Sequence, residues 1–402
     1  MRILIFLENN QNGGLNTFCS SLLNNWPNKD DEFSLVCNAS HPGIKNLLKT
    51  INVKCDFKSH NIPISWVISG TYLKFLPRLI AKACQPFLRV FLFPIQFYLL
   101  NKIFKNDNSD ELIVLNGGYP GGETCRLANI VWNSIKQKKG IHNFHNYAVS
   151  PRFGFEWFEN WIDKKTIKAT KSFISVSKSC SNSIYTRKFF NKNVNVDYIY
   201  NGVEIEKMNT SGSYRDKLNI GNSNLCVMLA NYETRKGHSF VLEAFSSVLK
   251  KHPDTYLVFA GGGTTNDIEK IKSQNNKLAI NKNVYFLNYV PDGLALIYDS
   301  DIVLIGSQSF ESFGLTAAEA MLLRKPIVST NVGGLAEVIG SQGDCGFLVE
   351  KDQPQEFAMQ IISLIEDQNL QKRMGDKGYK RVKKMFSAKE MSYKYHQELT
   401  RK

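Results

Sequence analysis

The sequence predicts an α/β protein built from two doubly wound parallel sheets. Short apolar runs alternate with longer stretches of helical pattern, which is typical of parallel strands covered by helices on both faces. The runs fall into two groups, separated by a stretch at 204–224 that is rich in Asn, Ser and Gly. Because 402 residues exceed the length at which one core usually stops growing, we expect two domains of similar size.

The strands and domains follow in chain order. In the first domain, 1–203, the strands are expected at 3–7, 33–37, 112–115 and 173–176. In the second domain, 204–385, they are expected at 226–229, 256–259, 284–287, 302–305 and 327–329. The segment 386–402 predicts a helix that packs back on the first domain, with one side formed by Phe386, Met391, Tyr395 and Leu399.

Charge and cysteine usage restrict the class of protein. With 50 basic and 36 acidic residues, the net charge of +14 favours an anionic partner: nucleic acid, an anionic membrane face or a phosphorylated substrate. Charge alone does not choose among these. The eight cysteines form no CxxC pair, which argues against a metal knuckle or disulfide framework and favours a reducing cytoplasm. The first apolar run is too short for a signal peptide and is expected to be a strand.

The most apolar region lies at 73–104. Basic residues such as Lys74 and prolines such as Pro86 and Pro94 interrupt it, so we expect no uninterrupted run of about 20 residues and no membrane-spanning helix. Two interpretations remain open. The region forms either an interfacial helix, with aromatic side chains in the membrane and basic ones at the headgroups, or one or two buried helices of an ordinary core.

The segment 311–319 carries the clearest chemistry. A predicted strand and a polar loop precede it, and 315–323 predicts a helix. Such a helix N-terminus presents free N–H groups and partial positive charge, which bind a diphosphate without a metal. We therefore expect Gly314, Leu315 and Thr316 to contact phosphate.

Two glutamates flank this turn. Glu319 lies about one helical turn beyond it, where like charges would repel a phosphate, so its carboxylate is better suited to bind the two hydroxyls of a ribose. Glu311 precedes the turn and is expected near the transferred sugar. There it would hold hydroxyls or stabilise positive charge at the anomeric carbon.

An ordered series of motifs surrounds this segment. With it, the second half of the chain resembles the retaining glycosyltransferases of family 4, which have the GT-B fold of two Rossmann-like domains facing a central cleft. The family signature is a pair of glutamates eight positions apart around Phe-Gly-Leu. The other matching motifs are Arg235-Lys236-Gly237-His238, Leu242-Glu243-Ala244-Phe245, Gly261-Gly262-Gly263, Lys325-Pro326-Ile327-Val328 and Gly346-Phe347-Leu348-Val349.

The resemblance implies a hexosyltransferase that needs neither metal nor cofactor. It would transfer a sugar with retention from a UDP- or GDP-sugar to a hydroxyl of a glycan or lipid-linked sugar, in bacterial surface polysaccharide synthesis. The second domain would hold the nucleotide and the first the acceptor. The implied donor-binding residues are Gly13, Gly14, Asn231, Arg235, Lys236, Tyr289, Val290, Ser312, Phe313, Gly314, Leu315, Thr316 and Glu319.

Lys236 is implied to be catalytic together with Glu311. Its ammonium group would neutralise charge that builds on the departing diphosphate. The family usually pairs this lysine with an arginine, at the place where this chain has Asn231. Either Arg235 supplies the missing charge, or Lys236 and the helix dipole suffice.

The first domain contributes two glycine loops and a histidine. Asn12-Gly13-Gly14 resembles the family's glycine loop, where backbone approaches the ligand. The second loop is expected to shape the acceptor site with Asn116, Gly117, Gly118 and Tyr119. His145 is implied to contact the donor sugar as the third catalytic residue, with His142 as a nearby competitor.

Other classes of protein have weaker support in the sequence. Asp299-Ser300-Asp301 has the form of a metal-binding motif, but its position before a strand makes a metal role unexpected. No GxGxxG supports a dinucleotide oxidoreductase. A non-catalytic membrane-surface or anion-binding protein on a degenerate transferase fold remains the alternative. We expect a cytoplasmic protein, peripheral on the inner membrane face, whose partners are the donor, the acceptor and anionic lipid, and not nucleic acid.

Overall fold

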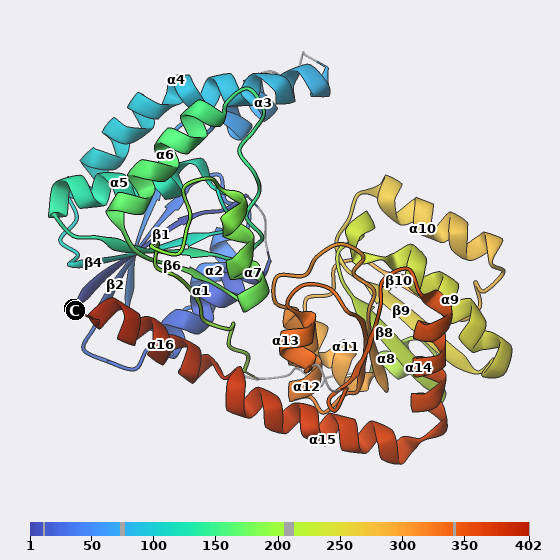
Figure 1. Cartoon of the computed structure of the whole chain (residues 1–402). Coiled ribbons are helices and arrows are strands. Elements are labelled where there is room, and N and C mark those ends of the chain that lie inside the picture. Colours follow the sequence, from blue (N-terminus) through green and yellow to red (C-terminus); the bar gives the residue numbers. More distant parts are fainter. Residues whose placement is uncertain (11–12, 73–76, 205–212, 341–342, 402) are drawn as a thin grey trace. The chain divides into compact units, whose positions relative to one another are not determined.

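The computed structural model describes residues 1–10, 13–72, 77–204, 213–340 and 343–401 (Figure 1). Contacts divide the chain into two compact units. Unit 1 comprises Met1–Gly202 and Ala388–Lys402, and unit 2 comprises Val203–Ser387. The sequence-based boundaries lay at 203/204 and 385/386. Asn12, Lys74 with its neighbours 73–76, and the part of the 204–224 stretch at 205–212 lie outside the described residues.

Unit 1 contains a parallel sheet in the order β3-β2-β1-β4-β5-β6-β7. The chain builds outwards from β1 to β3 on one side, then returns to the middle and builds outwards from β4 on the other. The sheet is therefore doubly wound. Its strands are β1 Arg2–Glu8, β2 Glu32–Asn38, β3 Cys55–His60, β4 Glu111–Asn116, β5 Gly140–Phe144, β6 Thr170–Ser175 and β7 Val196–Tyr198.

Helices cover both faces of this sheet because successive side chains of each strand point to opposite faces. Ile3 and Ile5 of β1 share a core with α1, α2 and α16, whereas Leu4 and Phe6 share one with α4 and α5. The helices are α1 Gly14–Asn24, α2 Ile44–Thr50, α3 Ser65–Tyr72, α4 Arg78–Lys105, α5 Glu123–Lys136, α6 Glu156–Ala169, α7 Lys178–Asn182, η1 Ser183–Thr186 and α16 Ala388–Thr400.

Unit 2 contains a second doubly wound parallel sheet, in the order β10-β9-β8-β11-β12-β13. The predicted fold class, with two parallel-sheet α/β domains, is therefore confirmed. The strands are β8 Asn224–Leu229, β9 Thr255–Ala260, β10 Val284–Leu287, β11 Ile302–Ile305, β12 Ile327–Thr330 and β13 Phe347–Val349. The helices are α8 Tyr214–Lys217, η2 Thr234–Lys236, α9 His238–Lys251, α10 Thr265–Lys277, α11 Gly293–Asp299, α12 Leu315–Leu322, α13 Leu335–Ile339, α14 Pro354–Glu366 and α15 Gln368–Met385.

The last helix of unit 1 differs from its prediction at one residue. Helix α16 begins at Ala388, and its Met391, Tyr395 and Leu399 are buried in the unit 1 core. Phe386 is instead the residue that caps the C-terminal end of α15 in unit 2, where its ring packs edge-on against Phe313 with centroids 5.5 Å apart. The expectation that Phe386 shares the face of α16 was therefore wrong.

Helix α4 corrects the expectation for the apolar region. Its 28 residues form one continuous helix that contains Pro86 and Pro94. Proline removes one helical hydrogen bond and costs about 3 kcal/mol inside a helix, but packing against α3 and α5 outweighs this cost. In the part of the chain that the structure describes, α4 is also the one helix whose length and composition would allow it to cross a membrane, from Ile80 to Lys105.

Candidate functional site

The candidate site of unit 2 lies where its strand order reverses. Strands β8 and β11 are parallel neighbours, and the chain leaves them toward opposite sides of the sheet. In doubly wound sheets the crevice beyond the carboxyl ends of such a strand pair is the usual ligand site. The loops that follow these two strands, 230–237 and 306–314, carry Lys236 and Glu311. The structure thus brings both predicted catalytic residues of unit 2 to the switch point.

Backbone contact between glycines holds the two loops together. Gly237 has φ of 75°, and a Cβ atom there would stand 1.8 Å from the carbonyl oxygen of Gly306. The N–H of Gln308 also donates to the carbonyl of Arg235 at 2.8 Å. Only glycine at position 237 allows this approach, which fixes the separation of the two loops.

An ion pair joins the loops at their side chains. Lys236 Nζ lies 2.6 Å from Glu311 Oε2, and both side chains are largely buried, at 18% and 16% exposure. Ser307 Oγ donates to the same carboxylate oxygen at 3.0 Å. The pair places one fixed positive and one fixed negative charge side by side. Such an arrangement can stabilise opposite charges that develop on two neighbouring parts of one ligand.

Helix α12 begins directly after this pair. Gly314 has φ of 93°, and a side chain there would collide with Leu335. The N–H groups of Ala317 and Ala318 bond to the carbonyl of Gly314, so the N–H groups before them have no intrahelical partner. This end of α12 is therefore suited to an anion. Thr316 Oγ1 bonds back to the carbonyl of Leu229 at 3.4 Å, which ties α12 to β8.

Glu319 is partly buried on α12. Burial raises the pKa of its carboxyl group to about 7. Among the described residues, no hydrogen bond to this carboxylate compensates its loss of hydration. An acid kept partly uncharged at neutral pH is poised to change its ionisation when hydroxyl donors reach it.

Asn231 and the triple glycine meet beside β8. Asn231 follows the strand, and its Oδ1 accepts a hydrogen bond from the N–H of Gly262 at 3.2 Å. A Cβ atom on Gly261 would stand 2.0 Å from the carbonyl oxygen of Ala230, so the glycines are required for close packing of two loops. The side-chain amide of Asn231 is exposed and keeps a donor available.

Arg235 is already engaged within its own loop. Its Nε donates to Glu233 Oε2 at 2.7 Å, and the guanidinium group lies over the ring of Phe310, 5.1 Å from its centroid. Of the two alternatives for the missing arginine, this pairing favours the one in which Lys236 and the helix dipole suffice.

The remaining predicted residues of unit 2 differ in accessibility. The side chain of Phe313 is 3% exposed and packs on Phe386, so only its backbone can reach a ligand. Ser312 is partly exposed on the same loop. Tyr289 is 66% exposed and Val290 partly buried, both on the loop after β10. Because β10 is the edge strand, this loop follows a strand two places away from β8 in the sheet.

The Asp299-Ser300-Asp301 motif is used internally. Asp301 accepts hydrogen bonds from Arg215 at 2.6 Å and from the N–H of Leu225 at 2.8 Å. Asp299 accepts from Arg215 through its carbonyl and from the N–H of Tyr214 through its carboxylate. The motif therefore anchors the start of β8 to that of β11, as its position before a strand had indicated.

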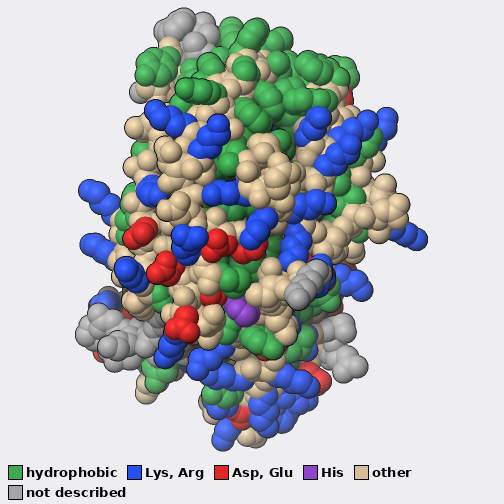
Figure 2. All heavy atoms as spheres, turned by 90° about the vertical axis from the view of Figure 1, so that its left-hand side faces the viewer, with side chains coloured by type: hydrophobic (Ala, Val, Ile, Leu, Met, Phe, Trp, Pro, Cys, Tyr) green, Lys and Arg blue, Asp and Glu red, His purple; other side chains and the backbone are tan. Residues whose placement is uncertain are grey.

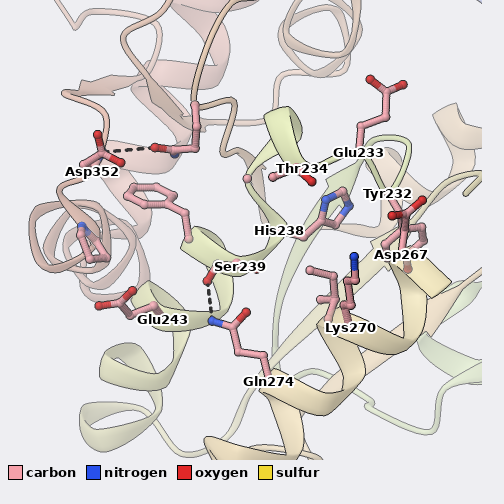
Figure 3. A pocket seen from close by; sticks show the side chains of 15 residues that line it. Tyr232, Glu233, Thr234, His238, Ser239, Glu243, Asp267, Lys270, Gln274 and Asp352 are labelled. Atoms are coloured by element: carbon pink, nitrogen blue, oxygen red, sulfur yellow. Dashed lines mark hydrogen bonds between the residues drawn. The ribbon is translucent and has the colours of Figure 1, made fainter. Parts of the chain in front are cut away.

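A cavity of about 620 Å³ lies next to the site, between α9, α10 and the loop before α9 (Figure 3). Gly237 and Gln308 line it, but Lys236 and Glu311 do not. Its wall carries one lysine, Lys270, against four carboxylates, those of Glu233, Glu243, Asp267 and Asp352. This charge balance disfavours a diphosphate, so the cavity is not the anion site.

In unit 1 the glycine loop 116–122 also follows a switch-point strand, β4. Its polar residues, however, hold the loop itself. Asn116 is fully buried, donates to the carbonyl of Pro120 at 3.0 Å and accepts from the N–H of Gly122 at 2.9 Å. Tyr119 is 1% exposed and donates to Asp163 at 2.8 Å. These two side chains are therefore structural, contrary to expectation. Gly117 and Gly118 remain accessible.

The two candidate histidines of unit 1 are now distinguished. Both ring nitrogens of His142 are bonded, to Asn116 at 3.2 Å and Asn129 at 2.9 Å. His145 follows β5, packs edge-on against Phe18 and leaves Nε2 without a partner among the described residues. Burial lowers the pKa of each to about 3, so both rings are neutral at physiological pH. His145 is the one with an unpaired ring nitrogen among the described residues, although that nitrogen is buried.

Gly13 and Gly14 begin α1 at the other switch-point strand, β1. The backbone of Gly13 is extended, and a Cβ atom there would meet nothing within 4 Å. Among the described residues, nothing crowds Gly13, and no backbone strain there requires glycine.

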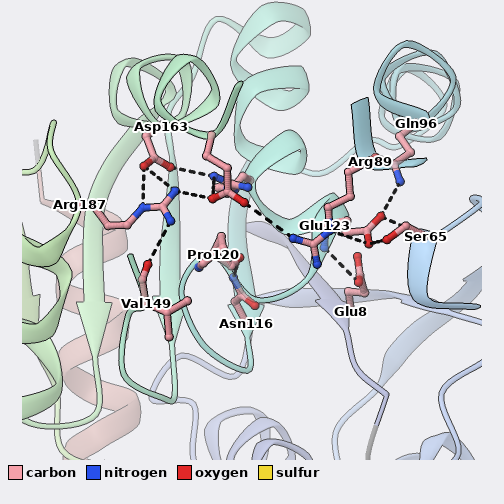
Figure 4. Close-up of polar contacts among 12 residues, drawn as sticks. Glu8, Ser65, Arg89, Gln96, Asn116, Pro120, Glu123, Val149, Asp163 and Arg187 are labelled. Carbon is pink, nitrogen blue, oxygen red and sulfur yellow. Dashed lines mark hydrogen bonds and ion pairs between the residues drawn. The ribbon is translucent and has the colours of Figure 1, made fainter. Parts of the chain in front are cut away.

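A buried network of charges was missed from sequence (Figure 4). Arg187, fully buried, pairs with Asp163 and Glu159 at 2.8 Å each. Arg126 pairs with Asp163 at 2.9 Å, and Arg89 of α4 links Glu159 to Glu123. At the start of α5, the carboxylate of Glu8 accepts hydrogen bonds from the backbone N–H groups of Glu123 and Thr124. The members are far apart in sequence, so no spacing signals the network.

Comparison with known proteins agrees with this geometry. Residues 211–381 match the family model for group 1 glycosyl transferases. The capsular polysaccharide biosynthesis glycosyltransferase CapM of Staphylococcus aureus is 26% identical over 290 residues, 70% of this chain and 74% of CapM. The N-acetyl-alpha-D-glucosaminyl L-malate synthase of Bacillus anthracis is 30% identical over 171 residues, 42% of this chain and 44% of that protein.

Solved structures extend the likeness to the whole chain. The structure of Anabaena Alr3699/HepE in complex with UDP has a TM-score of 0.75 at 17% identity, over 100% of both chains. A glycosyltransferase from Rickettsia africae has a TM-score of 0.74 at 20% identity, over 100% of this chain and 99% of its own. With two doubly wound units, the chain has the GT-B fold. The family match covers residues 211–381, so unit 2 is similar to group 1 glycosyl transferases.

Proposed function

We propose that this chain transfers a hexose from a UDP- or GDP-sugar to a hydroxyl of a glycan or lipid-linked sugar, with retention of anomeric configuration and without a metal ion. The observation that carries the proposal is the buried Lys236–Glu311 pair immediately before the N-terminus of α12. A cation, a carboxylate and free helix N–H groups at one switch point fit a diphosphate joined to a sugar better than any other ligand class considered above.

Each part of the donor has a partner in unit 2. The diphosphate would accept hydrogen bonds from the N–H groups of Gly314, Leu315 and Thr316, while Lys236 neutralises its charge. The ribose hydroxyls would donate to Glu319, whose carboxylate has no other partner among the described residues. Lys236 and the helix end together would take the part that a divalent cation plays in metal-dependent transferases.

The reaction proposed is a same-face displacement. The acceptor hydroxyl oxygen bonds to the anomeric carbon, and the bond from that carbon to the diphosphate oxygen breaks, with its electron pair leaving on the phosphate. The hydroxyl proton passes to the departing phosphate oxygen. Glu311 would stabilise the positive charge that develops at the anomeric carbon, and Lys236 the negative charge on the leaving group. His145 would contact a donor hydroxyl only if Nε2, which is buried in this structure, became accessible on donor binding.

The proposed setting is surface polysaccharide synthesis at the inner face of the cytoplasmic membrane. Two observations on other proteins support it: CapM is named for capsular polysaccharide biosynthesis, and HepE was solved with UDP and glucose. The excess of basic residues suits phosphorylated donors and anionic lipids, and no nucleic-acid partner is proposed.

A nucleotide-sugar screen tests the donor class. We expect UDP- or GDP-hexoses to raise the melting temperature, because a ligand at 100 times its dissociation constant adds about 2.7 kcal/mol to stability. With the best donor, NMR of the product should show the anomer of the donor, and turnover should persist in excess chelator. An inverted anomer would refute retention, and activity lost in chelator and restored by Mg²⁺ would refute the metal-free mechanism.

The ionisation of Glu319 predicts the pH dependence of nucleotide binding. Only the charged carboxylate accepts from both ribose hydroxyls, and a pKa of about 7 means that the charged fraction falls as pH drops. We expect affinity for the nucleotide to fall about tenfold from pH 8 to pH 6, in proportion to that fraction. Isothermal titration calorimetry at several pH values measures it. In Glu319→Gln this component should vanish and leave only the titration of the ligand; an unchanged slope would contradict the ribose role.

The same shift has a consequence for stability without ligand. The unfolded chain loses the Glu319 proton near pH 4.5, whereas the folded protein keeps it up to about pH 7. Between these values the folded state binds more protons, so this group lowers the free energy of unfolding as pH rises.

A further inference from the structure

Helix α4 is apolar on both sides: Leu100 and Phe104 are buried in unit 1, and large apolar side chains also lie on its outer side. Two polar side chains point inward with the buried ones. Arg89 donates to Glu123 at 3.1 Å, and Gln96, 2% exposed, donates to the carbonyl of Pro63 at 2.8 Å. On the outer side, Phe91 is 73% exposed and Tyr98 is 69% exposed. If water alone covered the outer side of α4, its polar side chains would be expected on that side and its aromatic side chains in the core.

The exposed apolar surface continues from α4 across α6. Phe93 of α4 packs against Trp161 of α6 with centroids 5.2 Å apart, and Phe87 against Phe155 at 4.9 Å, so the two segments are neighbours. Figure 2 shows hydrophobic side chains gathered at this end of the molecule, where Figure 1 places α4. We call this surface the aromatic face; it comprises Phe87, Phe91, Ile95, Tyr98, Phe153, Trp157 and Trp161, all exposed.

Basic residues border the aromatic face. Helix α4 contains no Asp or Glu, and of the acidic residues on α6, Glu159 and Asp163 are buried in ion pairs while Glu156 is partly exposed. Figure 2 shows Lys and Arg side chains below the hydrophobic surface. The exposed basic residues of these segments are Lys82, Lys102, Lys105, Arg152, Lys164, Lys165 and Lys168.

We infer that the aromatic face docks unit 1 onto an anionic lipid bilayer, with α4 and α6 lying in the interface plane. Trp, Tyr and Phe prefer the boundary between headgroups and acyl chains, and lysines around them attract anionic headgroups. A symmetric second copy is the poorer occupant, because it would bring two basic borders together.

The inner side of α4 argues for lying on the membrane and against crossing it. Leu100 and Phe104 are fully buried in the core shared with β1, and Arg89 is tied to the buried network through Glu123 and Glu159. Crossing would require α4 to leave that core and to carry Arg89 into hydrocarbon. This inference rests on the membrane setting of the proposed function, but lipid binding can be measured independently of sugar transfer.

The test is flotation of the full-length protein with vesicles of phosphatidylcholine, alone or with phosphatidylglycerol, at low and high salt. We expect binding to the anionic vesicles that weakens with salt. Phe91→Ser with Tyr98→Ser should lower the partition coefficient at least about tenfold. The matched control is Met359→Ser with Tyr393→Ser, which removes apolar side chains 59% and 46% exposed on α14 and α16 and should bind as the unaltered protein does.

The basic border is tested in the same assay. Each of Lys164→Gln, Lys165→Gln and Lys168→Gln should weaken binding to anionic vesicles about fivefold at low salt. Lys277→Gln and Lys282→Gln, exposed in unit 2, serve as controls that should change nothing. Brominated lipid should quench tryptophan fluorescence, and Trp157→Phe with Trp161→Phe should remove most of that quenching while the protein still binds.

Two results would overturn the inference. One is a serine double variant that floats as well as the unaltered protein. The other is a protein that does not bind anionic vesicles at low salt but forms a dimer, which the two serine substitutions dissociate. That result would show that the aromatic face binds a second copy of the chain. Transfer to a water-soluble acceptor, measured in parallel, should be unchanged in the serine variant. If sugar transfer were absent from the unaltered protein, the variants and the controls alike, that result would count against the proposed function and not against docking.

Discussion

Replacing Glu311 with glutamine should lower kcat for sugar transfer about 10²- to 10³-fold, the loss found when one preorganised electrostatic contact is removed from a transition state. Glutamine keeps the shape of the side chain and can still meet Ser307, but it carries no negative charge beside the developing oxocarbenium ion. It also leaves the Lys236 ammonium without its counter-ion. The measurement is steady-state transfer from the nucleotide-sugar identified in the donor screen.

The control for this variant is Glu269→Gln on α10, which removes an exposed carboxylate paired with Lys272. It should keep full activity. Thermal stabilisation by the donor shows whether Glu311→Gln is folded and still binds. A folded Glu311→Gln protein with normal turnover would refute the proposed role of Glu311. An unaltered protein that binds donors but transfers no sugar would favour the non-catalytic alternative.

Replacing Arg187 with methionine should destabilise unit 1 by about 3–5 kcal/mol, as expected when one partner of a buried ion pair is removed. Arg187 is fully buried and donates to Asp163, Glu159 and the carbonyl of Val149. Methionine fills part of the space but leaves two carboxylates with less positive charge around them, although Arg126 and Arg89 remain close.

Urea unfolding followed by tryptophan fluorescence measures this effect in the correct unit, because all five tryptophans lie in unit 1. They are Trp26, Trp66, Trp132, Trp157 and Trp161. Arg2→Met is the control: its pair with Asp110 is exposed, so its removal should leave the unfolding midpoint nearly unchanged. Equal midpoints for the two variants would show that the network does not hold unit 1 together.

The sequence predicted the strands that consist of a continuous apolar run. The strands that it missed are β3, β5, β7 and β13. Three of them, β3, β7 and β13, are edge strands. The fourth, β5, is central and buried, but His142 and Asn143 interrupt its apolar run. Edge strands need no continuous apolar run, since one side of their ladder is free. The continuity of α4 through Pro86 and Pro94 could not be predicted either, because it depends on packing with α3 and α5.

For the site, the structure brings together two residues that the sequence had singled out for their chemistry. Lys236 and Glu311 are 75 positions apart, yet the topology brings them to 2.6 Å. The side chains of Asn116, Tyr119 and Phe313 instead make buried contacts that only the folded loops reveal, and Phe313 keeps only its backbone for a ligand. A glycine-rich loop marks a place where backbone comes close to something. It does not say whether that neighbour is a ligand or the protein itself.

Helix α16 belongs to unit 1 but follows unit 2 in the sequence, and this order has a consequence for folding while the protein is being synthesised. One wall of the unit 1 core is formed by Met391, Tyr395 and Leu399, which follow all of unit 2 in the chain. While the ribosome makes unit 2, the nascent unit 1 therefore exposes the apolar side of α1 that α16 will cover. Unit 2, though second in order, has all of its residues available first. Unit 1 must wait for 388–402 to emerge, so chaperones have reason to attend to it longest.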